Sequence, residues 1–420
     1  MLKYKIKGGL TLANTDTLLK VEVKTSLPSE SRTSQTDYRE SMAKLPGFMQ
    51  GLLTWITGKP LTGDLLPTKT PAYHLAMVLA TLIGGILLSI FAILFQGLWL
   101  LLLLPGWIFT VSGARQLQVV IVHHCAHGNF TRNRSLDRRL GQIISAILLF
   151  REFDGYQQDH IKHHADPSAV EDETVKFLRL LLGIQEGMSV QEQWHKLWFS
   201  LVSPIFHSQF LAARLVSSLG STSITHRVLT WSFLIIVLTV VTLSGSWHMF
   251  LIVWVFPLTV LYQISTTLRL CSEHLRLPAL KSNIRRDKQS YSQATVGIFL
   301  GDPVPDYTMP FWGQLQHWCR WWLRLMLIHI PTRVFVLVGD CPHHDYHHRH
   351  PNGNWANATV ARQQNIDAGC PGWNEPYREV VGFWASIELA FQSISQQEPV
   401  VITRTDEPIH KLYTLSPEEG

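Results

Sequence analysis

Two long stretches without charged side chains divide the chain. No Asp, Glu, Lys or Arg occurs in residues 70–114 or in residues 228–268. An apolar helix of about 20 residues rises about 30 Å, which is enough to cross the hydrocarbon core of a bilayer. Divided at their turns, the two stretches give four predicted spans, which are residues 75–95, 97–113, 228–243 and 249–265. The pattern therefore predicts an all-α integral membrane protein with two transmembrane helical hairpins.

Three further apolar segments are too short or too interrupted to span a membrane. Residues 140–150 are few, and residues 197–219 contain Pro204 and Arg214. Residues 318–338 combine adjacent tryptophans with several arginines, which is typical of a helix that lies at the membrane surface. We expect all three segments to form interfacial or buried helices.

The basic residues predict the orientation of the hairpins. All 36 Lys and Arg residues lie in residues 1–69, in residues 115–227 and after residue 268, so none lies in the two short outer turns. Cytoplasmic loops are enriched in Lys and Arg. We therefore expect both termini, and the long segment between the hairpins, to lie on the cytoplasmic side.

The positions of the polar segments predict that the chain has three parts. Residues 1–45 are polar and rich in Ser and Thr, and we expect them to be partly disordered. They contain no apolar run of the kind that a secretory signal needs. Residues 46–360 form the predicted membrane domain, and residues 361–420 form a cytoplasmic C-terminal extension.

Composition excludes some classes of protein. Charged residues make up 16% of the chain, against about 25% in an average soluble protein. The net charge of +5 is too mild to indicate a nucleic-acid partner. An odd number of cysteines, five without compact spacing, argues against a disulfide framework and fits a reducing compartment.

The histidines are clustered. Twelve of the twenty fall into four short clusters on the predicted cytoplasmic side: H-H-C-A-H from His123, H-I-K-H-H from His160, the single His274, and H-H-D-Y-H-H-R-H-P from His343. Each cluster lies just after a predicted hairpin or in the segment that follows it. Imidazole is a good ligand for Fe, Zn, Cu and Ni, so the clusters indicate a metal site.

The spacing within the clusters fits helices. Side chains three and four residues apart share one helix face, so His123 pairs with His127, and His160 pairs with His163 and His164. Adjacent histidines diverge by about 100°, so neighbours can ligate two different metal ions.

In the last cluster, this spacing leaves two registers open. His343 and His347 are four residues apart, and so are His344 and His348. Either pair could therefore share one helix face. The choice between His343 and His344 therefore needs a second criterion.

The order of the clusters resembles that of the histidine boxes in the membrane fatty-acid desaturase and hydroxylase superfamily. Its members have two membrane hairpins and the boxes H-x(3–4)-H, H-x-x-H-H and H-x-x-H-H, with one more histidine after the second hairpin. All four elements occur here, in this order, from His123 to Pro351. The last box is similar to the H-N-Y-H-H-x-F-P of acyl-chain desaturases, and the aligned Pro351 favours His344 over His343.

The resemblance implies a cytoplasmic helical cap that holds two non-heme iron ions. The implied ligands are His123, His127, His160, His163, His164, His274, His344, His347 and His348. It also implies activation of O₂, a membrane lipid or fatty acyl substrate, and a separate electron donor of the ferredoxin, rubredoxin or cytochrome b5 type. Here His124, Asp345 and His350 depart from the common pattern.

Other residues near the boxes have weaker predicted roles. Asp340 and Glu273 are candidates for carboxylates that orient a ligand imidazole. Cys125 and Cys341 are expected to be bystanders. The isolated histidines are expected to be structural: His74, His195, His207, His226, His248, His317, His329 and His410.

Three functions are compatible with these features. The first is an O₂-dependent fatty acyl desaturase, and the second is a lipid or carotenoid hydroxylase or ketolase with the same fold. The third is a histidine-rich membrane carrier of metal ions without catalysis. A carrier would place ionisable residues inside its spans, and the four predicted spans contain no charged residue. The sequence therefore favours an oxidase.

Overall fold

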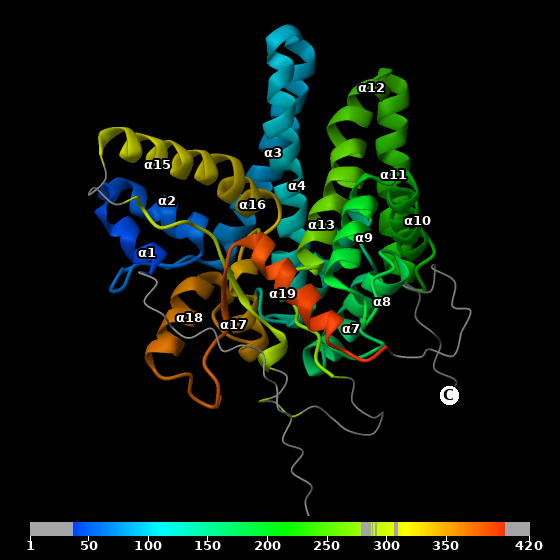
Figure 1. Cartoon of the computed structure of the whole chain (residues 1–420). Coiled ribbons are helices and arrows are strands. Elements are labelled where there is room, and N and C mark those ends of the chain that lie inside the picture. Colours follow the sequence, from blue (N-terminus) through cyan, green and yellow to red (C-terminus); the bar gives the residue numbers. More distant parts are fainter. Residues whose placement is uncertain (1–36, 279–286, 288, 290–291, 306–309, 400–420) are drawn as a thin grey trace, which may run out of the picture. The chain divides into compact units, whose positions relative to one another are not determined.

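The computed structural model describes residues 37–278, 287, 289, 292–305 and 310–399. Helices make up most of these residues, together with one two-stranded sheet. Figure 1 shows two helical hairpins that project side by side from a cap of shorter helices. The predicted all-α membrane fold is confirmed.

Four helices are long and apolar enough to cross a membrane, as predicted. They are α3 (Pro71–Phe95), the helix Gly97–Ala126 that contains α4 (Leu103–Gln116) and α5 (His123–Ala126), α11 (Ile224–Ser244), and the helix Trp247–Leu270 that contains α12 (Trp247–Phe250) and α13 (Tyr262–Leu270). All four are longer than predicted. The second helix continues to Ala126 instead of residue 113, because the protein buries Arg115 and the charge does not end the helix.

Small residues let α3 and α4 pack closely. A side chain on Gly113 would lie 2.6 Å from the Cβ of Leu82, so no larger residue fits there. Such small-residue contacts are typical of helix pairs in membranes. The indole Nε1 of Trp107 donates to the carbonyl of Ile252 at 2.8 Å and links the first hairpin to the second.

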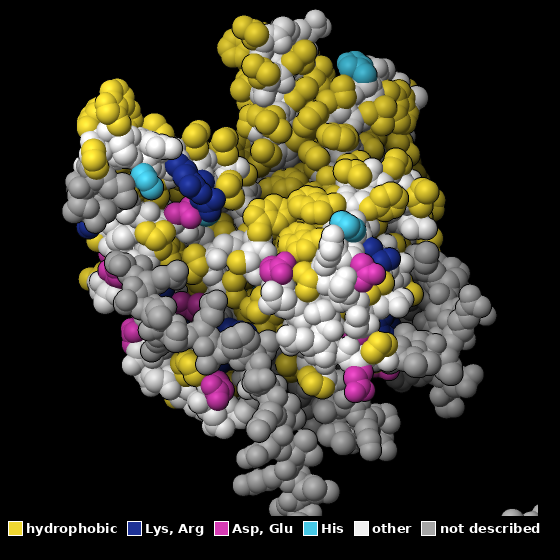
Figure 2. All heavy atoms as spheres, viewed as in Figure 1, with side chains coloured by type: hydrophobic (Ala, Val, Ile, Leu, Met, Phe, Trp, Pro, Cys, Tyr) yellow, Lys and Arg dark blue, Asp and Glu magenta, His cyan; other side chains and the backbone are white. Residues whose placement is uncertain are grey.

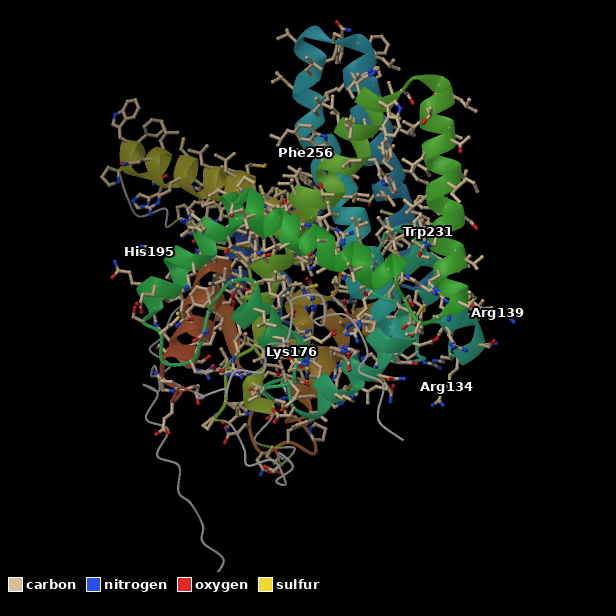
Figure 3. The ribbon with its side chains drawn as sticks, turned by 90° about the vertical axis from the view of Figure 1, so that its right-hand side faces the viewer. Arg134, Arg139, Lys176, His195, Trp231 and Phe256 are labelled. Carbon is tan, nitrogen blue, oxygen red and sulfur yellow. The ribbon has the colours of Figure 1, made fainter. Side chains whose placement is uncertain are left out.

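The hairpins expose apolar side chains over most of their length. Leu94 is 65% exposed and Leu243 is 84% exposed. Figure 2 shows a hydrophobic surface over the hairpins, whereas most charged side chains lie on the cap. In Figure 3, Trp231 lies on a hairpin, and Arg134 and Arg139 lie in the cap. An apolar surface of this extent indicates contact with lipid.

The cap consists of twelve α-helices and one short sheet within the described residues. The helices are α1 (Tyr38–Ser41), α2 (Gly47–Thr57), α6 (Arg134–Ile147), α7 (Phe153–Ala165), α8 (Glu173–Leu180), α9 (Val190–Val202), α10 (Pro204–Leu219), α15 (Phe311–Arg324), α16 (Ile330–Phe335), α17 (His344–Arg349), α18 (Ala358–Asp367) and α19 (Phe383–Ser395). Strands β1 (Gly297–Phe299) and β2 (Glu379–Val381) pair in parallel, with Gly297 opposite Glu379.

The shorter apolar segments form cap helices and not spans. Residues 197–219 divide into α9 and α10 at Pro204, because proline is favoured in the first turn of a new helix and Ser203 caps it. In α15, Phe311 is 70% exposed and Trp312 is 76% exposed. An exposed aromatic face beside the hairpins is typical of an interfacial helix.

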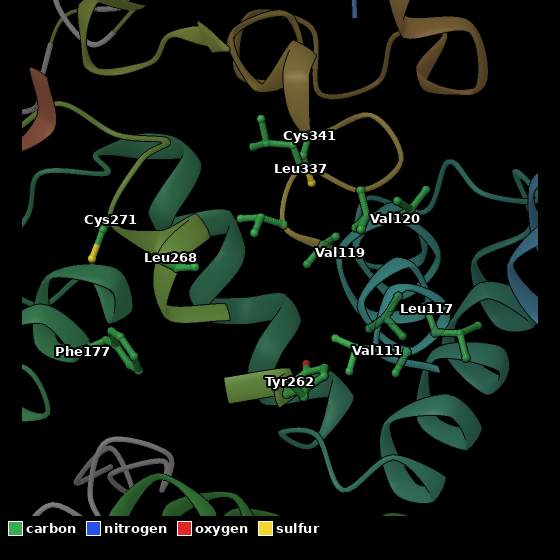
Figure 4. Packing of buried hydrophobic residues seen from close by; sticks show 14 of the residues in the cluster. Val111, Leu117, Val119, Val120, Phe177, Tyr262, Leu268, Cys271, Leu337 and Cys341 are labelled. Carbon is green, nitrogen blue, oxygen red and sulfur yellow. The ribbon is translucent and has the colours of Figure 1, made fainter. Parts of the chain in front are cut away.

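The largest buried cluster joins the inner ends of the two hairpins to the cap. Figure 4 shows Val111 of the first hairpin facing Tyr262 of α13, with Leu337 above them, and all three belong to this cluster. Full burial of an apolar side chain contributes about 1.5–3 kcal/mol. This cluster therefore fixes the ends of the hairpins relative to the segment that precedes the last histidine cluster.

The described parts of both terminal segments pack against the rest of the cap. In residues 37–45, Tyr38 of α1 and Met42 just after it are buried, and the buried Arg39 donates to Thr54 at 2.9 Å. In the C-terminal extension, β2 pairs with β1 and α19 contributes to the largest buried cluster. Partial disorder was predicted for residues 1–45, of which residues 1–36 lie outside the described residues.

Cysteine labelling tests the predicted orientation. Ser135 in the cap and Gly245 at the tip of the second hairpin are both exposed. In a variant that lacks the exposed Cys319, a cysteine at position 245 should react with an impermeant maleimide added to intact cells. A cysteine at position 135 should react only after the membrane is opened, because we expect the cap to be cytoplasmic. Labelling of position 135 from outside contradicts this orientation.

Candidate metal centre

The end of the second span carries the first histidine cluster. The wide π-helical turns Leu117–Val122 precede α5, which carries His123, and His127 follows α5 directly. Local π-helical turns are frequent at functional sites. The second cluster lies on α7 and the third just after α13, and α17 carries His344, His347 and His348 of the fourth.

Five histidines form a first group in which all the ligating nitrogens lie within 4.8 Å of one another: His123, His127, His160, His164 and His347. The Nε2 atoms of His123 and His347 are 2.6 Å apart. Those of His127 and His160 are 2.9 Å apart, and those of His164 and His347 are 3.0 Å apart. The five rings therefore direct the same nitrogen toward one point.

Four other histidines form a second group within the same limit: His163, His274, His344 and His348. The Nε2 atom of His274 lies 3.1 Å from that of His163. It also lies 3.2 Å from those of His344 and His348. The two groups together contain the nine residues that the resemblance implied.

Neighbouring histidines belong to different groups. His164 joins the first group and His163 the second, and His347 joins the first and His348 the second. This is the divergence expected for adjacent positions on a helix. The rings of His164 and His348 stack with centroids 4.3 Å apart, so the two groups are in contact.

The two groups fit metal ions by spacing and by charge. Histidine nitrogens about 2.1 Å from one ion and at right angles are about 3 Å apart. Burial, and then the neighbouring imidazoles, lower the pKa of His160, His164, His347 and His348. Burial also lowers the pKa of His127 to about 3. These five rings therefore favour the neutral form, and a neutral imidazole has the lone pair that a metal requires.

Asp172 orients one histidine and was missed in the sequence. Its Oδ2 lies 2.7 Å from the Nδ1 of His163, and its Oδ1 accepts from the backbone of Thr174 at the start of α8. Burial lowers the pKa of His163, but the charge and hydrogen bond of Asp172 outweigh it and raise the pKa. A carboxylate on Nδ1 directs Nε2 toward the site. The only signal was an acidic residue shortly after the second cluster.

Glu273 and Asp340 occupy different positions. Glu273 Oε2 lies 2.6 Å from Arg269 Nη2 and 3.8 Å from His344 Nε2, so it borders the second group. Asp340 lies 2.9 Å from the Nε2 of His124, which belongs to neither group. Asp340 therefore acts on His124 and not directly on one of the nine histidines.

His124 is enclosed beside the first group. Its ring stacks on Trp355 with centroids 4.3 Å apart, and it lies 5.0 Å from the ring of His123 and 5.2 Å from that of His347. Its position suits a support for these two rings. Trp355 was not identified in the sequence, because it follows the boxes without a motif of its own.

The other candidate residues lie outside both groups. The Nε2 of His343 is 2.7 Å from the carbonyl oxygen of Gly58, and burial lowers its pKa to about 3. Burial raises the pKa of the Cys341 thiol, so this thiol stays protonated. None of the isolated histidines within the described residues joins a group. His410 lies outside the described residues.

A buried ion pair supports the last cluster. The Nη2 of Arg362 donates to Asp345 Oδ2 at 2.7 Å, and its Nη1 donates to Glu379 Oε1 at 2.8 Å. Asp345 is 1% exposed and Arg362 is 3% exposed. The pair ties α17, α18 and β2 together. It explains the acidic residue at position 345, because a buried arginine needs a charged partner.

A cavity of about 180 Å³ borders the two groups. His123, His160, His163 and His344 form part of its wall. Its apolar lining comes from Val119, Phe150, Phe177, Phe210 and Leu270. The rest of its lining is mostly polar and charged.

Comparison with known proteins identifies one family. The family model described as Fatty acid desaturase matches residues 98–379, which include both histidine groups and the second hairpin. No curated protein matches the chain.

Metal content of two variants tests the register of the last cluster. His344→Ala should lower the metal content by about one ion per chain, because it removes one of the few imidazoles of the second group. His343→Ala should keep the wild-type content, since His343 contacts Gly58. The measurement is inductively coupled plasma mass spectrometry of purified protein. The opposite pattern would place His343 in the site.

Unfolding of two matched variants tests the ion pair. Asp345→Ala should lower the free energy of unfolding by about 3–5 kcal/mol, because it leaves a buried arginine without its closest partner. Asp154→Ala is the control, since its partner Arg138 has a side chain that is 60% exposed. That change should cost about 0–1 kcal/mol. Equal effects in denaturant titrations would show that the Asp345 pair has no special role.

Proposed function

The chain belongs to the fatty acid desaturase family, and from this premise we propose that it is an O₂-dependent desaturase of the fatty acyl chain of a lipid. The proposed reaction removes two hydrogen atoms from adjacent CH₂ groups. O₂ accepts these atoms together with two electrons and two protons, and two water molecules form. A separate carrier of the ferredoxin, rubredoxin or cytochrome b5 type supplies the electrons.

The nine histidines would hold two non-heme iron ions, one in each group. His123, His127, His160, His164 and His347 would bind the first ion, and His163, His274, His344 and His348 the second. Bound iron supplies the activation of O₂ that an unreactive C–H bond requires. One observation supports this assignment most strongly, namely that nine imidazoles converge in two adjacent groups.

The residues around the groups have distinct proposed tasks. Asp172 keeps the Nε2 of His163 directed toward the other histidines of its group. Phe150, Phe177 and Phe210 line the cavity. They would exclude water and hold the acyl chain against the histidine wall. The cap would face the cytoplasm, where the electron carrier has access.

Product analysis tests the proposed function. Lipids from a host that expresses the protein with a matching electron donor should contain a new double bond, detected by gas chromatography and mass spectrometry. His160→Ala should abolish the product and leave the protein in the membrane, because it removes a ligand that no neighbour replaces. His195→Ala is the control, since His195 belongs to neither group.

The other outcomes identify the alternatives. A new hydroxyl or keto group would assign the chain to the hydroxylases or ketolases. Unchanged lipids from iron-loaded protein with an active donor would contradict an oxidase. Metal uptake by cells under those conditions would then favour a metal carrier.

A further inference from the structure

A basic surface lies on the segment that follows the first histidine cluster. Four arginines occur within eight residues, and all four are exposed: Arg132, Arg134, Arg138 and Arg139. Arg138 forms an ion pair with Asp154 at 2.6 Å. The other three form no ion pair with any described residue, and together they are called the arginine surface below. Figure 3 shows Arg134 and Arg139 at the edge of the cap, with their side chains pointing away from it.

The backbone under the arginine surface is held in place. The buried Asp137 accepts from the hydroxyl of Thr131 at 2.6 Å and from its backbone amide at 2.9 Å. Asn133 caps α6 by accepting from the backbone amides of Ser135 and Leu136, at 3.1 and 3.2 Å. The arginines therefore project from an ordered loop and helix start, and the acidic residue among them is turned inward.

The arginine surface begins next to the first histidine group. Gly128 follows His127 directly and has a φ of 66°. A side chain on Gly128 would lie 3.2 Å from the Cγ of Arg134, so the stem of this arginine packs closely on the glycine. One of the three arginines therefore contacts the residue beside a histidine of the first group.

Packed rings connect the same loop with the first group. The ring of Phe130 lies 5.6 Å from that of Trp355, whose Nε1 donates to the carbonyl of Asn129 at 3.3 Å. Trp355 in turn stacks on His124, with centroids 4.3 Å apart and planes at 15°. The ring of His124 lies 5.2 Å from that of His347. Trp355 and His124 thus form a packed path from the loop to the first group.

The two features together indicate a partner that delivers electrons. Electron transfer slows steeply with distance, so a carrier must bind where little protein covers the metal site. Opposite charges on two surfaces speed their encounter and orient it. Interfaces of electron-transfer proteins are small, so three arginines can occupy a large part of one. A basic surface at the outer end of a short path to the histidines meets both requirements.

We propose that the arginine surface binds a small acidic electron carrier of the ferredoxin type, with Trp355 and His124 between the carrier and the first histidine group. The proposal rests on the proposed function in one respect, that an external carrier supplies the electrons. In each transfer the reduced carrier loses one electron, and the metal ion that the first group would hold gains it. No proton and no bond is transferred, and Trp355 and His124 begin and end in the same oxidation state.

Anionic lipid headgroups are the other partners that exposed arginines attract at a membrane. The observations favour a protein, because a headgroup needs only the charges and not the packed rings behind them. Both partners are therefore included in the test, and they give different results.

Binding of a purified plant-type ferredoxin tests the proposal without measuring turnover. Full-length, iron-loaded protein is held in nanodiscs of phosphatidylcholine, and binding is followed by biolayer interferometry. The triple variant Arg132→Gln, Arg134→Gln, Arg139→Gln should bind at least about tenfold more weakly than the wild type, because it removes the attracting charges. Wild-type binding should also weaken between about 0.01 M and about 1 M salt, where the screening length falls from about 30 Å to about 3 Å.

A second triple variant is the matched control. Lys44→Gln, Lys196→Gln, Arg320→Gln removes the same charge from other parts of the cap, at residues that form no ion pair within the described chain. It should keep the wild-type affinity. Equal weakening in both triple variants, or no binding of ferredoxin to the wild type, overturns the proposal. So does loss of bound phosphatidylglycerol from the arginine variant, measured by native mass spectrometry, with unchanged affinity for ferredoxin.

Photo-cross-linking tests the position of the carrier. Asn354 is exposed and precedes Trp355 directly, and His195 is an exposed residue of α9. With p-benzoylphenylalanine at position 354, the protein should capture ferredoxin on illumination. With the same residue at position 195, it should not. Capture at position 195 and not at position 354 would place the carrier away from the path and overturn the proposal.

The results separate this proposal from the proposed function. Weaker ferredoxin binding by the arginine variant, together with a new hydroxyl group in the lipids of the expressing host, supports the docking surface and contradicts the desaturase. A new double bond, together with ferredoxin binding that the arginine variant does not change, supports the desaturase and contradicts the docking surface.

Discussion

Convergence of nine imidazoles is the constraint on which the rest of the structure depends. Within each of the two groups, neighbouring imidazole nitrogens lie about 3 Å apart, although the histidines come from four separate segments of the chain. Such an arrangement is unfavourable unless the rings are neutral or share an ion, since charged rings would repel one another strongly at low dielectric. Burial lowers the pKa of rings such as those of His160 and His348, and the surrounding framework holds all nine rings in place.

The framework combines a membrane part and a cap. Close packing of α3 on α4 at Gly113 places the inner end of the second span, which carries His123. The buried cluster between the hairpins and the cap then fixes His274, just after α13, relative to α17. The ion pair of Arg362 with Asp345 and Glu379 fastens α17 to the C-terminal segment. The residues after the last box are therefore part of the support of the site.

Much of this could be predicted from the sequence because it depends on local patterns. Long apolar runs without charge predict spans, and spacings of three and four residues predict which histidines share a helix face. The length of the second span was underestimated, since Arg115 is buried by contacts that a local pattern does not contain. Asp172, Trp355 and the Arg362 pair were missed for a similar reason: each acts through a contact formed only in the folded chain.

The central claim is that each histidine group holds one iron ion. It is tested most directly by the iron content of the purified full-length protein after iron-replete expression, measured against its concentration from amino-acid analysis. The account predicts about two iron ions per chain, the number that two groups of imidazoles accommodate. Stoichiometric zinc without iron, or a single ion per chain that further iron loading does not change, would contradict it.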